Sequence, residues 1–340
     1  MDMIFFQALL HPLTFSDDNP NTLFESLTAV LSYDLVSTII LWESRDMLRV
    51  LELYCGIGGF AQASGTRAMV VAAIDQSELA LSVYRLNYPD TPVICRNIET
   101  ISTNFLCSFT PDMWWLSPPC QPYTVRGKRR DIDDPRAASL LNLIRILPEA
   151  PPLHLGMENV EGFATSRARE LLLKALYISG FRVHERLICP TELGIPSRRP
   201  RYYLIASQGD LLDVEPPRPL HYPLKHFLDS DPESGLQIPR DVVDRFGKGM
   251  NKIDVTDPDA YTTCFTSSYG KALMRSGSYL YWRGGVRYFS PDEIIRLLGF
   301  PRGFKWPSTM TLRKRWHLAG NSISVFALRE VLRIIPHFRN

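Results

Sequence analysis

The feature that most constrains the fold is a strand that runs directly into a glycine-rich turn. Residues 48–54 predict a strand, and Cys55-Gly56-Ile57-Gly58-Gly59 follows it. Such a turn lets the backbone approach a nucleotide closely. A second predicted strand, residues 69–74, ends in Asp75, at the spacing of about 20 residues from which a carboxylate binds ribose hydroxyls. The glycines alone are equally typical of a plain tight turn, but together with both strands and Asp75 they favour a nucleoside-containing cofactor.

Strands and helices continue to alternate up to residue 206. We expect one helix over 77–87, capped by Ser77, and an amphipathic helix over 165–180. The other expected strands are 93–95, 112–116, 153–156, 183–188 and 202–206. This alternation predicts an α/β fold, a Rossmann-like sheet with helices on both faces, in which strand 93–95 brings Asn97-Ile98 to the ligand-binding edge.

One proline-containing loop holds a cysteine in a rigid backbone conformation. The segment Ser117-Pro118-Pro119-Cys120-Gln121-Pro122 follows the apolar strand 112–116. Its prolines fix φ and deny the chain helical hydrogen bonds, so Cys120 lies at the tip of a rigid loop. A thiolate held there can attack a substrate, and an inert buried cysteine is the alternative interpretation.

Three charged segments each allow two interpretations. The run Arg126-Gly127-Lys128-Arg129-Arg130 is either a solvated loop or a cluster that holds phosphate and favours the Cys120 thiolate. Glu158 comes just after strand 153–156, where it either faces a ligand or caps a helix. The arginines of Ser197-Arg198-Arg199-Pro200-Arg201 are either surface charges or a grip on a phosphate or base oxygen.

Composition narrows the class of protein without deciding its function. The net charge of +2 does not by itself indicate a nucleic-acid-binding protein. The six cysteines form no CxxC pair and no zinc-like spacing with histidine, which favours a reducing compartment and no metal site. We therefore expect a cytoplasmic protein, or also a nuclear one in a eukaryote. No apolar run is long enough to cross a membrane.

The chain is expected to divide into four parts. Residues 1–46 form an extension of unknown role, unless translation begins at Met47, directly before the first strand. Residues 47–207 form the cofactor-binding domain, and residues 208–285, rich in proline, glycine and aromatic residues, form a small irregular lobe. Residues 286–340 return to the first domain, with a helix capped by Ser290 and a last helix over 322–335.

The ordered set of motifs resembles the cytosine-5 methyltransferases. The motifs, which span about residues 48–335, are Gly56-Ile57-Gly58-Gly59, Pro118-Pro119-Cys120, Glu158-Asn159-Val160, Arg199-Pro200-Arg201 and Gly320-Asn321-Ser322. Within this family the chain is most similar to the tRNA-aspartate methyltransferase branch. The features shared with that branch are Ser117, Asp134-Pro135-Arg136 followed by Ser139, and Cys264-Phe265-Thr266.

The resemblance implies S-adenosyl-L-methionine as the cofactor. Its implied binding residues are Tyr54, Gly56, Ile57, Gly58, Gly59, Asp75, Asn97, Ile98, Pro118, Asn321 and Ser322. Two positions depart from the family pattern, because Asn97 stands where an acidic residue is frequent and Asp75 replaces the common glutamate.

The resemblance also implies the chemistry. Cys120 would add to carbon 6 of cytosine, Glu158 would act as the acid at ring nitrogen 3, and Arg199 and Arg201 would complete the catalytic set. The implied substrate-binding residues are Gln121, Arg126, Lys128, Arg129, Arg130, Cys264, Phe265 and Thr266. The implied substrate is cytosine 38 in the anticodon loop of tRNA-Asp, with DNA as a weaker partner, and the implied enzyme is a monomer.

Three other functions stay open. A DNA cytosine-5 methyltransferase would use the same catalytic set. A catalytically silent RNA-binding module would keep the fold, although the intact Cys120, Glu158 and Arg199 argue against it. A dinucleotide oxidoreductase rests on the glycine turn alone, whose Gly-x-Gly-Gly spacing does not match GxGxxG.

Overall fold

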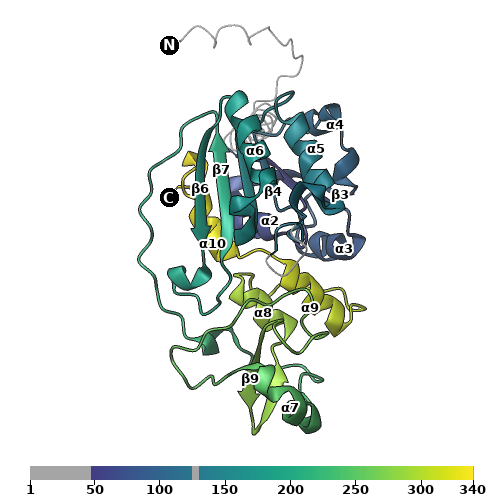
Figure 1. The fold of residues 1–340 in the computed structure, drawn as a ribbon, viewed down its shortest axis with the longest axis vertical. Coiled ribbons are helices and arrows are strands. Elements are labelled where there is room, and N and C mark those ends of the chain that lie inside the picture. Colours follow the sequence, from purple (N-terminus) through teal and green to yellow (C-terminus); the bar gives the residue numbers. More distant parts are fainter. Residues whose placement is uncertain (1–46, 125–129, 340) are drawn as a thin grey trace, which may run out of the picture. The chain divides into compact units, whose positions relative to one another are not determined.

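Seven strands form one mostly parallel sheet in the order β3-β2-β1-β4-β5-β7-β6 (Figure 1). The computed structural model describes residues 47–124 and 130–339, so the predicted extension 1–46 lies outside the described residues. The strands are β1 (Leu48–Leu53), β2 (Ala68–Asp75), β3 (Val93–Cys95), β4 (Met113–Leu116), β5 (His154–Val160), β6 (Arg182–Ile188) and β7 (Arg201–Ser207). Strands β1 to β5 run parallel, whereas β7 is antiparallel to both β5 and β6. The predicted α/β sheet is confirmed.

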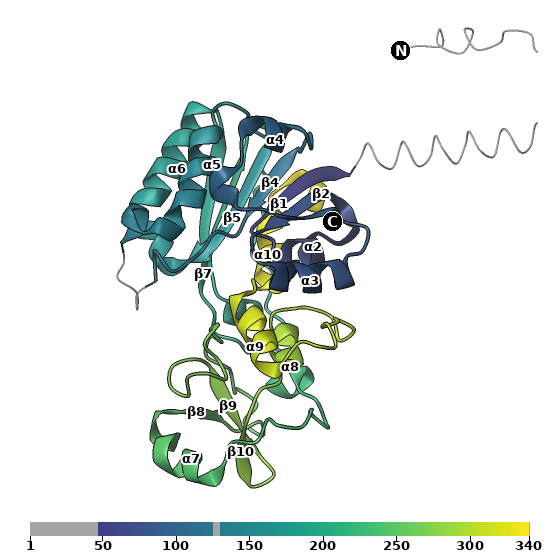
Figure 2. The same ribbon diagram turned by 90° about the vertical axis from the view of Figure 1, so that its right-hand side faces the viewer.

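Helices cover both faces of this sheet (Figure 2). They are α2 (Gly59–Ser64), α3 (Glu78–Asn87), α4 (Thr103–Cys107), α5 (Ala138–Ile146), α6 (Arg167–Ile178) and α10 (Val325–Leu332). Two further helices, α8 (Pro291–Leu297) and α9 (Leu312–Asn321), lie between the sheet and the small lobe. Successive side chains of β1 point to opposite faces, as strand geometry requires. Val50 packs into the core shared with α2, α3 and α10, and Leu51 packs into the core shared with α5 and α6.

Strand β5 is longer than its sequence predicts. We expected it to end at Gly156, but it continues to Val160 because β7 pairs with it along its whole length. This pairing places Glu158 opposite Tyr203 and Val160 opposite Arg201. Glu158 is therefore held within the sheet and does not follow the end of the strand.

The small lobe is more regular than predicted. It contains α7 (Arg240–Phe246) and a three-stranded sheet of β8 (Asn251–Ile253), β9 (Ser278–Trp282) and β10 (Gly285–Tyr288). The β9–β10 hairpin turns through Arg283 and Gly284, whose φ angles of 46° and 80° suit a two-residue hairpin. The domain boundaries at 208 and 286 stay a prediction, since Leu48–Asn340 clusters as one compact unit.

The C-terminal helices differ from the prediction in one boundary. We expected the last helix to begin at Ser322, but α9 ends at Asn321 and α10 begins at Val325. The Ser322 hydroxyl donates back to the Leu318 carbonyl, and Ser324 caps α10 by accepting from the Ala327 N–H. In the described parts of the chain, no helix has the length and apolar character needed to cross a membrane.

Candidate active site

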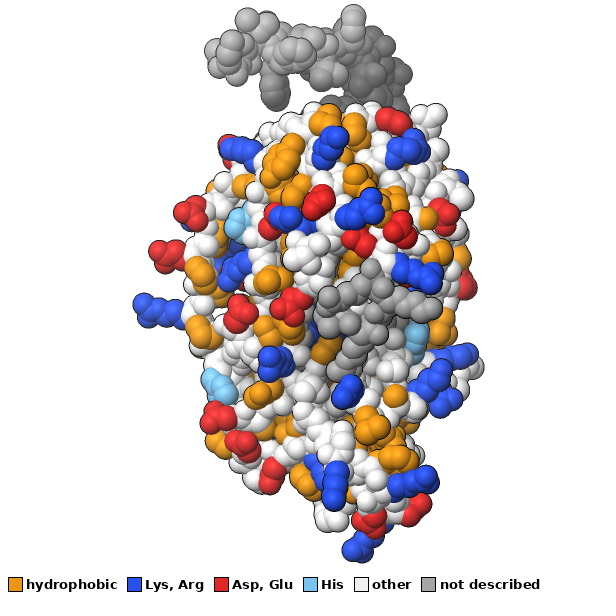
Figure 3. All heavy atoms as spheres, in the orientation of Figure 1, with side chains coloured by type: hydrophobic (Ala, Val, Ile, Leu, Met, Phe, Trp, Pro, Cys, Tyr) orange, Lys and Arg blue, Asp and Glu red, His pale blue; other side chains and the backbone are white. Residues whose placement is uncertain are grey.

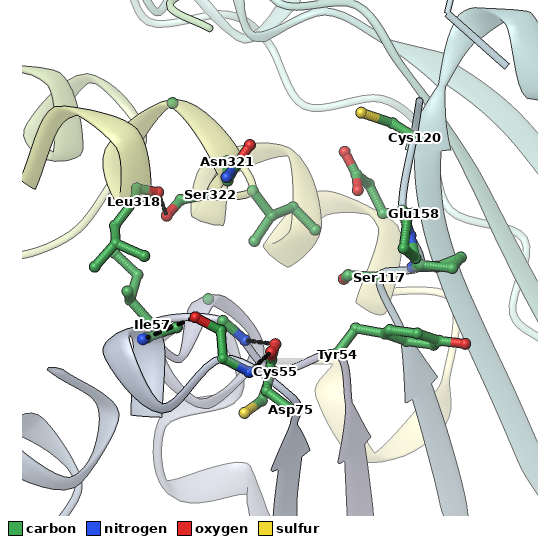
Figure 4. Close-up of a pocket in the computed structure, with 18 of the residues that line it drawn as sticks. Tyr54, Cys55, Ile57, Asp75, Ser117, Cys120, Glu158, Leu318, Asn321 and Ser322 are labelled. Atoms are coloured by element: carbon green, nitrogen blue, oxygen red, sulfur yellow. Dashed lines mark hydrogen bonds between the residues drawn. The ribbon is translucent and has the colours of Figure 1, made fainter. Parts of the chain in front are cut away.

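A cavity of about 380 Å³ lies where β1 and β4 end, and α9 closes its other side (Figure 4). Most of the predicted site residues line it. They are Tyr54, Gly56, Ile57, Gly59, Asp75, Pro118, Cys120, Gln121, Glu158, Arg199, Arg201, Asn321 and Ser322. The parallel topology explains this convergence, because the carboxyl ends of neighbouring parallel strands meet at one edge.

The glycine turn leaves room for a ligand at one position and packs tightly at another. Gly56 has φ 54°, and a side chain added there would meet no atom within 4 Å. Gly58 has φ 91°, and an added Cβ would lie 2.3 Å from the Tyr88 ring. The open side of Gly56 faces the cavity, so a cofactor can approach the backbone there.

Asp75 lies in the cavity and also fixes the turn. One oxygen of its carboxylate accepts the Gly56 N–H at 3.0 Å, and the other accepts the Ser77 N–H at 2.8 Å. The carboxylate thereby joins the glycine turn to the first residues of α3. The predicted contact with ribose would use the remaining lone pairs of the same oxygens.

A second cavity of about 200 Å³ shares Tyr54 and Gln76 with the first. Asn97 and Ile98 line it, as the sequence predicts for residues that follow β3. Asn97 caps the short helix after β3 by accepting the Glu99 N–H at 3.0 Å. Pro119 and Arg136 also line both cavities, so these residues mark the boundary between them together with Tyr54 and Gln76.

Side chains from strands β4 and β5 hold the loop that carries Cys120 by hydrogen bonds. The Trp115 indole N–H donates to the Ser117 hydroxyl at 3.1 Å, and the Asn159 amide donates to the Pro118 carbonyl at 3.2 Å. The Tyr123 N–H closes a turn on the Cys120 carbonyl. Together with the two prolines, these bonds hold the thiol at the cavity, as the sequence predicts.

Glu158 and Arg201 form a buried ion pair beside Cys120. The Arg201 Nε lies 3.1 Å from the Glu158 carboxylate, and the two side chains are only 13% and 12% exposed. Burial raises the pKa of the Glu158 carboxyl, and the nearby Arg201 and Arg199 only partly oppose this effect. Burial also raises the pKa of the Cys120 thiol, with Arg201 again opposing it. A raised pKa suits a carboxyl group that acts as an acid near neutral pH.

Arg199 lines the cavity and also bonds to two distant segments of the backbone. Its guanidinium donates to the carbonyls of Phe265, Gly320 and Ser322, at 3.0, 3.2 and 2.6 Å. It also donates to the Cys264 sulfur at 3.1 Å. Arg199 thus joins the small lobe to the turn after α9, and the prediction that it also holds the base oxygen stays a prediction.

The predicted substrate-binding segment 264–266 lies behind the cavity. Burial by itself would raise the pKa of the Cys264 thiol, but the positive charges of Arg199 and Arg201 outweigh this effect. The pKa therefore lies below its ordinary value. Phe265 is 4% exposed and packs against Tyr269 and Phe289, so its ring is core and is not available to a substrate. The Thr266 hydroxyl bonds to Ser268 within its own segment. None of the three lines the main cavity.

The basic run is only partly visible. Arg126, Lys128 and Arg129 lie outside the described residues, and the predicted phosphate contacts at these positions stay a prediction. Arg130 is exposed. In the described part of the site, the cations near Cys120 include Arg201, Arg199 and Arg136.

Glu52 is a site residue that the sequence analysis missed. It is 1% exposed within β1 and lines the cavity behind the glycine turn. Its carboxylate accepts the Tyr84 hydroxyl at 2.7 Å and the Phe60 N–H at 3.2 Å. Burial raises the pKa of Glu52 to about 8. The available signal was a glutamate between two leucines inside a predicted strand.

Glu52→Gln is expected to remove a pH dependence of stability. Because the folded-state pKa of about 8 exceeds the usual 4.5, the stabilising protonated form is fully present below pH 4.5 and is lost as the pH rises to 8. The free energy of unfolding of Glu52→Gln should therefore rise relative to the native chain across this window, by up to about 5 kcal/mol. Urea unfolding at several pH values measures the difference. The exposed carboxylate variant Glu170→Gln is the control, and a pH-independent difference for Glu52→Gln would contradict the expectation.

The comparisons with known proteins agree with this geometry. The family model for C-5 cytosine-specific DNA methylase matches residues 48–272, which is more than half of the chain. The chain belongs to this family. The tRNA (cytosine(38)-C(5))-methyltransferase of Bos taurus is 30% identical over 388 residues, covering 85% of this chain and 99% of the relative. The predicted family resemblance is confirmed.

Two solved structures share the fold of this chain. The Entamoeba histolytica methyltransferase EhMeth superposes with a TM-score of 0.78 at 27% identity, covering 85% of this chain and 97% of that one. The S. pombe Dnmt2 methyltransferase superposes with a TM-score of 0.74 at 29% identity, covering 84% and 97%. The similarity therefore extends through the sheet and the small lobe alike.

Proposed function

We propose that the chain transfers a methyl group from S-adenosyl-L-methionine to carbon 5 of a cytosine in tRNA. The observation that carries this proposal is that Cys120, the Glu158–Arg201 pair and the glycine turn line one cavity. The turn and its neighbours fit the donor, because Gly56 leaves open space and Asn97 and Ile98 line an adjoining cavity. When bound there, S-adenosyl-L-methionine supplies an electrophilic methyl group.

The protein residues would make the cytosine ring nucleophilic. Carbon 5 of cytosine is unreactive because attack there breaks the conjugation of the ring. Addition of the Cys120 thiolate to carbon 6, with Glu158 protonating ring nitrogen 3, makes carbon 5 enamine-like. Carbon 5 then accepts the methyl group, and loss of its proton expels Cys120 and restores the ring. Arg201 holds the Glu158 carboxyl in place during these steps.

Cytosine 38 in the anticodon loop of tRNA-Asp is the proposed target. The name of the Bos taurus relative supports position 38, and the branch features Ser117 and Cys264-Phe265-Thr266 support tRNA-Asp. A loop base is already partly unstacked, so its extrusion into the cavity costs less than the few kcal/mol that a paired base requires. We further propose that the protein acts as a cytoplasmic monomer.

A basic surface beside the cavity supports an RNA substrate. Figure 3 shows Lys and Arg side chains gathered over α9, where Arg313 and Lys314 are exposed. One turn further along the same helix, His317 lines the cavity. These cations can hold the phosphates that flank an extruded base, which makes binding sensitive to salt.

The deciding experiment compares three substrates under the same conditions. Labelled methyl transfer is measured from S-adenosyl-L-methionine to tRNA-Asp, to the same tRNA with cytosine 38 replaced by uridine, and to duplex DNA containing cytosine. We expect labelling of the first substrate, loss of labelling in the second, and at most a slow reaction with DNA.

Each arm tests a different part of the proposal. Unchanged labelling of the altered tRNA would exclude cytosine 38 as the target. A DNA rate equal to the tRNA rate would favour the DNA methyltransferase alternative. Absence of labelling on every substrate, together with RNA binding, would indicate the catalytically silent module.

A further inference from the structure

His317 is a residue of α9 at the rim of the main cavity. His317 and Asn321 are four residues apart on this helix, so their side chains are neighbours, and both line the cavity. The His317 Nδ1 lies 3.1 Å from the Ser267 carbonyl oxygen. Its Nε2 lies 3.3 Å from the Asn321 side-chain nitrogen.

Elementary hydrogen-bond chemistry fixes the roles of these atoms. A carbonyl oxygen only accepts, so the His317 Nδ1 must carry the proton that it shares with Ser267. In the neutral ring, Nε2 is then an acceptor, and it can pair only with the NH₂ end of the Asn321 amide. The amide oxygen of Asn321 is therefore turned away from His317.

The freed oxygen faces the reaction space. Figure 4 shows the Asn321 amide across the cavity from Glu158 and Cys120. The turn that carries Asn321 is also held from behind, because Arg199 donates to the carbonyls of Gly320 and Ser322. Arg199 thereby restrains the backbone on both sides of Asn321, and the contact with His317 favours one orientation of the amide group.

We propose that His317 is a positioning residue that orients the Asn321 amide, so that its oxygen accepts a hydrogen bond from an N–H group of a bound ligand. This inference rests on the proposed function, which supplies two sources of such a group. One is the ammonium of the amino-acid end of the methyl donor, and the other is the exocyclic amine of the target cytosine. Either N–H group needs an acceptor, and a flipped amide would present a second donor instead.

The test exchanges the acceptor at position 317 while keeping a helix-forming side chain. His317→Gln keeps an oxygen that can accept from Asn321, whereas His317→Lys offers only donors and should flip the amide. We expect His317→Lys to weaken one ligand by about 10-fold, as for the loss of one hydrogen bond. The Kd of S-adenosylhomocysteine, measured by calorimetry, reports the donor, and the KM for RNA reports the base. In either case kcat at saturation should change little, and His317→Gln should stay close to the native chain.

Controls separate this role from a structural one. His221 is an exposed histidine whose ring also contacts one backbone carbonyl, that of Pro258, so His221→Lys is the matched control. In an Asn321→Ala background, His317→Lys should have no further effect, because the group that it acts through is gone. Long-range ¹H–¹⁵N correlation of the imidazole should show the Nδ1-protonated tautomer in the native chain.

Several outcomes would overturn the inference. They are an Nε2-protonated tautomer, equal losses for His317→Gln and His317→Lys, no loss for either, or an undiminished effect of His317→Lys in the Asn321→Ala background. Failure of the native chain to bind S-adenosylhomocysteine would instead contradict the proposed function. The two failures are therefore distinguishable.

Discussion

Cys120→Ala is expected to abolish methyl transfer while leaving the affinity for S-adenosylhomocysteine nearly unchanged. The thiol is held at the cavity by a loop tied to Trp115 and Asn159, and it acts on the base and not on the donor. Deletion of a covalent nucleophile should lower kcat by roughly 10⁴-fold or more. Single-turnover methylation of tRNA measures the loss, and calorimetry measures the affinity.

A trapping experiment identifies the nucleophile directly. In the presence of S-adenosyl-L-methionine, RNA that carries 5-fluorocytosine at the target position should form a stable covalent adduct with the native chain. After methyl transfer to carbon 5, the fluorine cannot leave as the carbon-5 proton does, so Cys120 is not expelled. Because burial raises the pKa of Cys120, the thiolate fraction and the rate of trapping should increase as the pH rises above neutrality.

Cys107→Ala provides the matched control. Cys107 is an exposed thiol at the end of α4 and does not line the cavity, so this variant should trap RNA normally. An adduct in Cys120→Ala would mean that another thiol attacks the base. Cys55 would then be the first candidate, because it is the other cysteine among the described residues that lines the cavity.

What could be predicted from the sequence is local along the chain. The glycine turn after β1 and the Pro-Pro-Cys loop after β4 each follow from a few adjacent residues. Parallel strands then bring these segments together at one edge, so their convergence was also predictable. The glycine and proline residues, together with the parallel arrangement of the strands, were sufficient to predict that these two segments line one site.

What could not be predicted depends on contacts between distant residues. The partners of Arg199 lie 65 to 123 residues further along the chain, and no local pattern indicates them. The length of β5 depends on its pairing with β7, which follows β6 in the sequence but lies between β5 and β6 in the sheet. Phe265 belongs to a motif that suggested substrate contact, yet packing against Tyr269 and Phe289 places its ring in the core.

Glu158→Gln is expected to lower kcat by about 10²-fold or more, the usual contribution of a general acid. Within β5, pairing with β7 holds Glu158 beside Arg201, and burial raises the pKa of the carboxyl. The protonated form thus persists to higher pH than in an exposed glutamate. Glutamine keeps the size and can still donate a hydrogen bond, but it cannot transfer a proton to ring nitrogen 3.

Glu161, the first residue after β5, provides the matched control. It lies three residues after Glu158 and is exposed, so Glu161→Gln makes the same change of charge outside the cavity and should keep normal turnover. Loss of the buried partner of Arg201 also affects stability, and the melting temperature of Glu158→Gln is therefore measured beside kcat. A folded Glu158→Gln with near-normal kcat would mean that the carboxyl only holds Arg201. Unchanged affinity for S-adenosylhomocysteine with a large fall in kcat would show that Glu158 acts on the base during the chemical step.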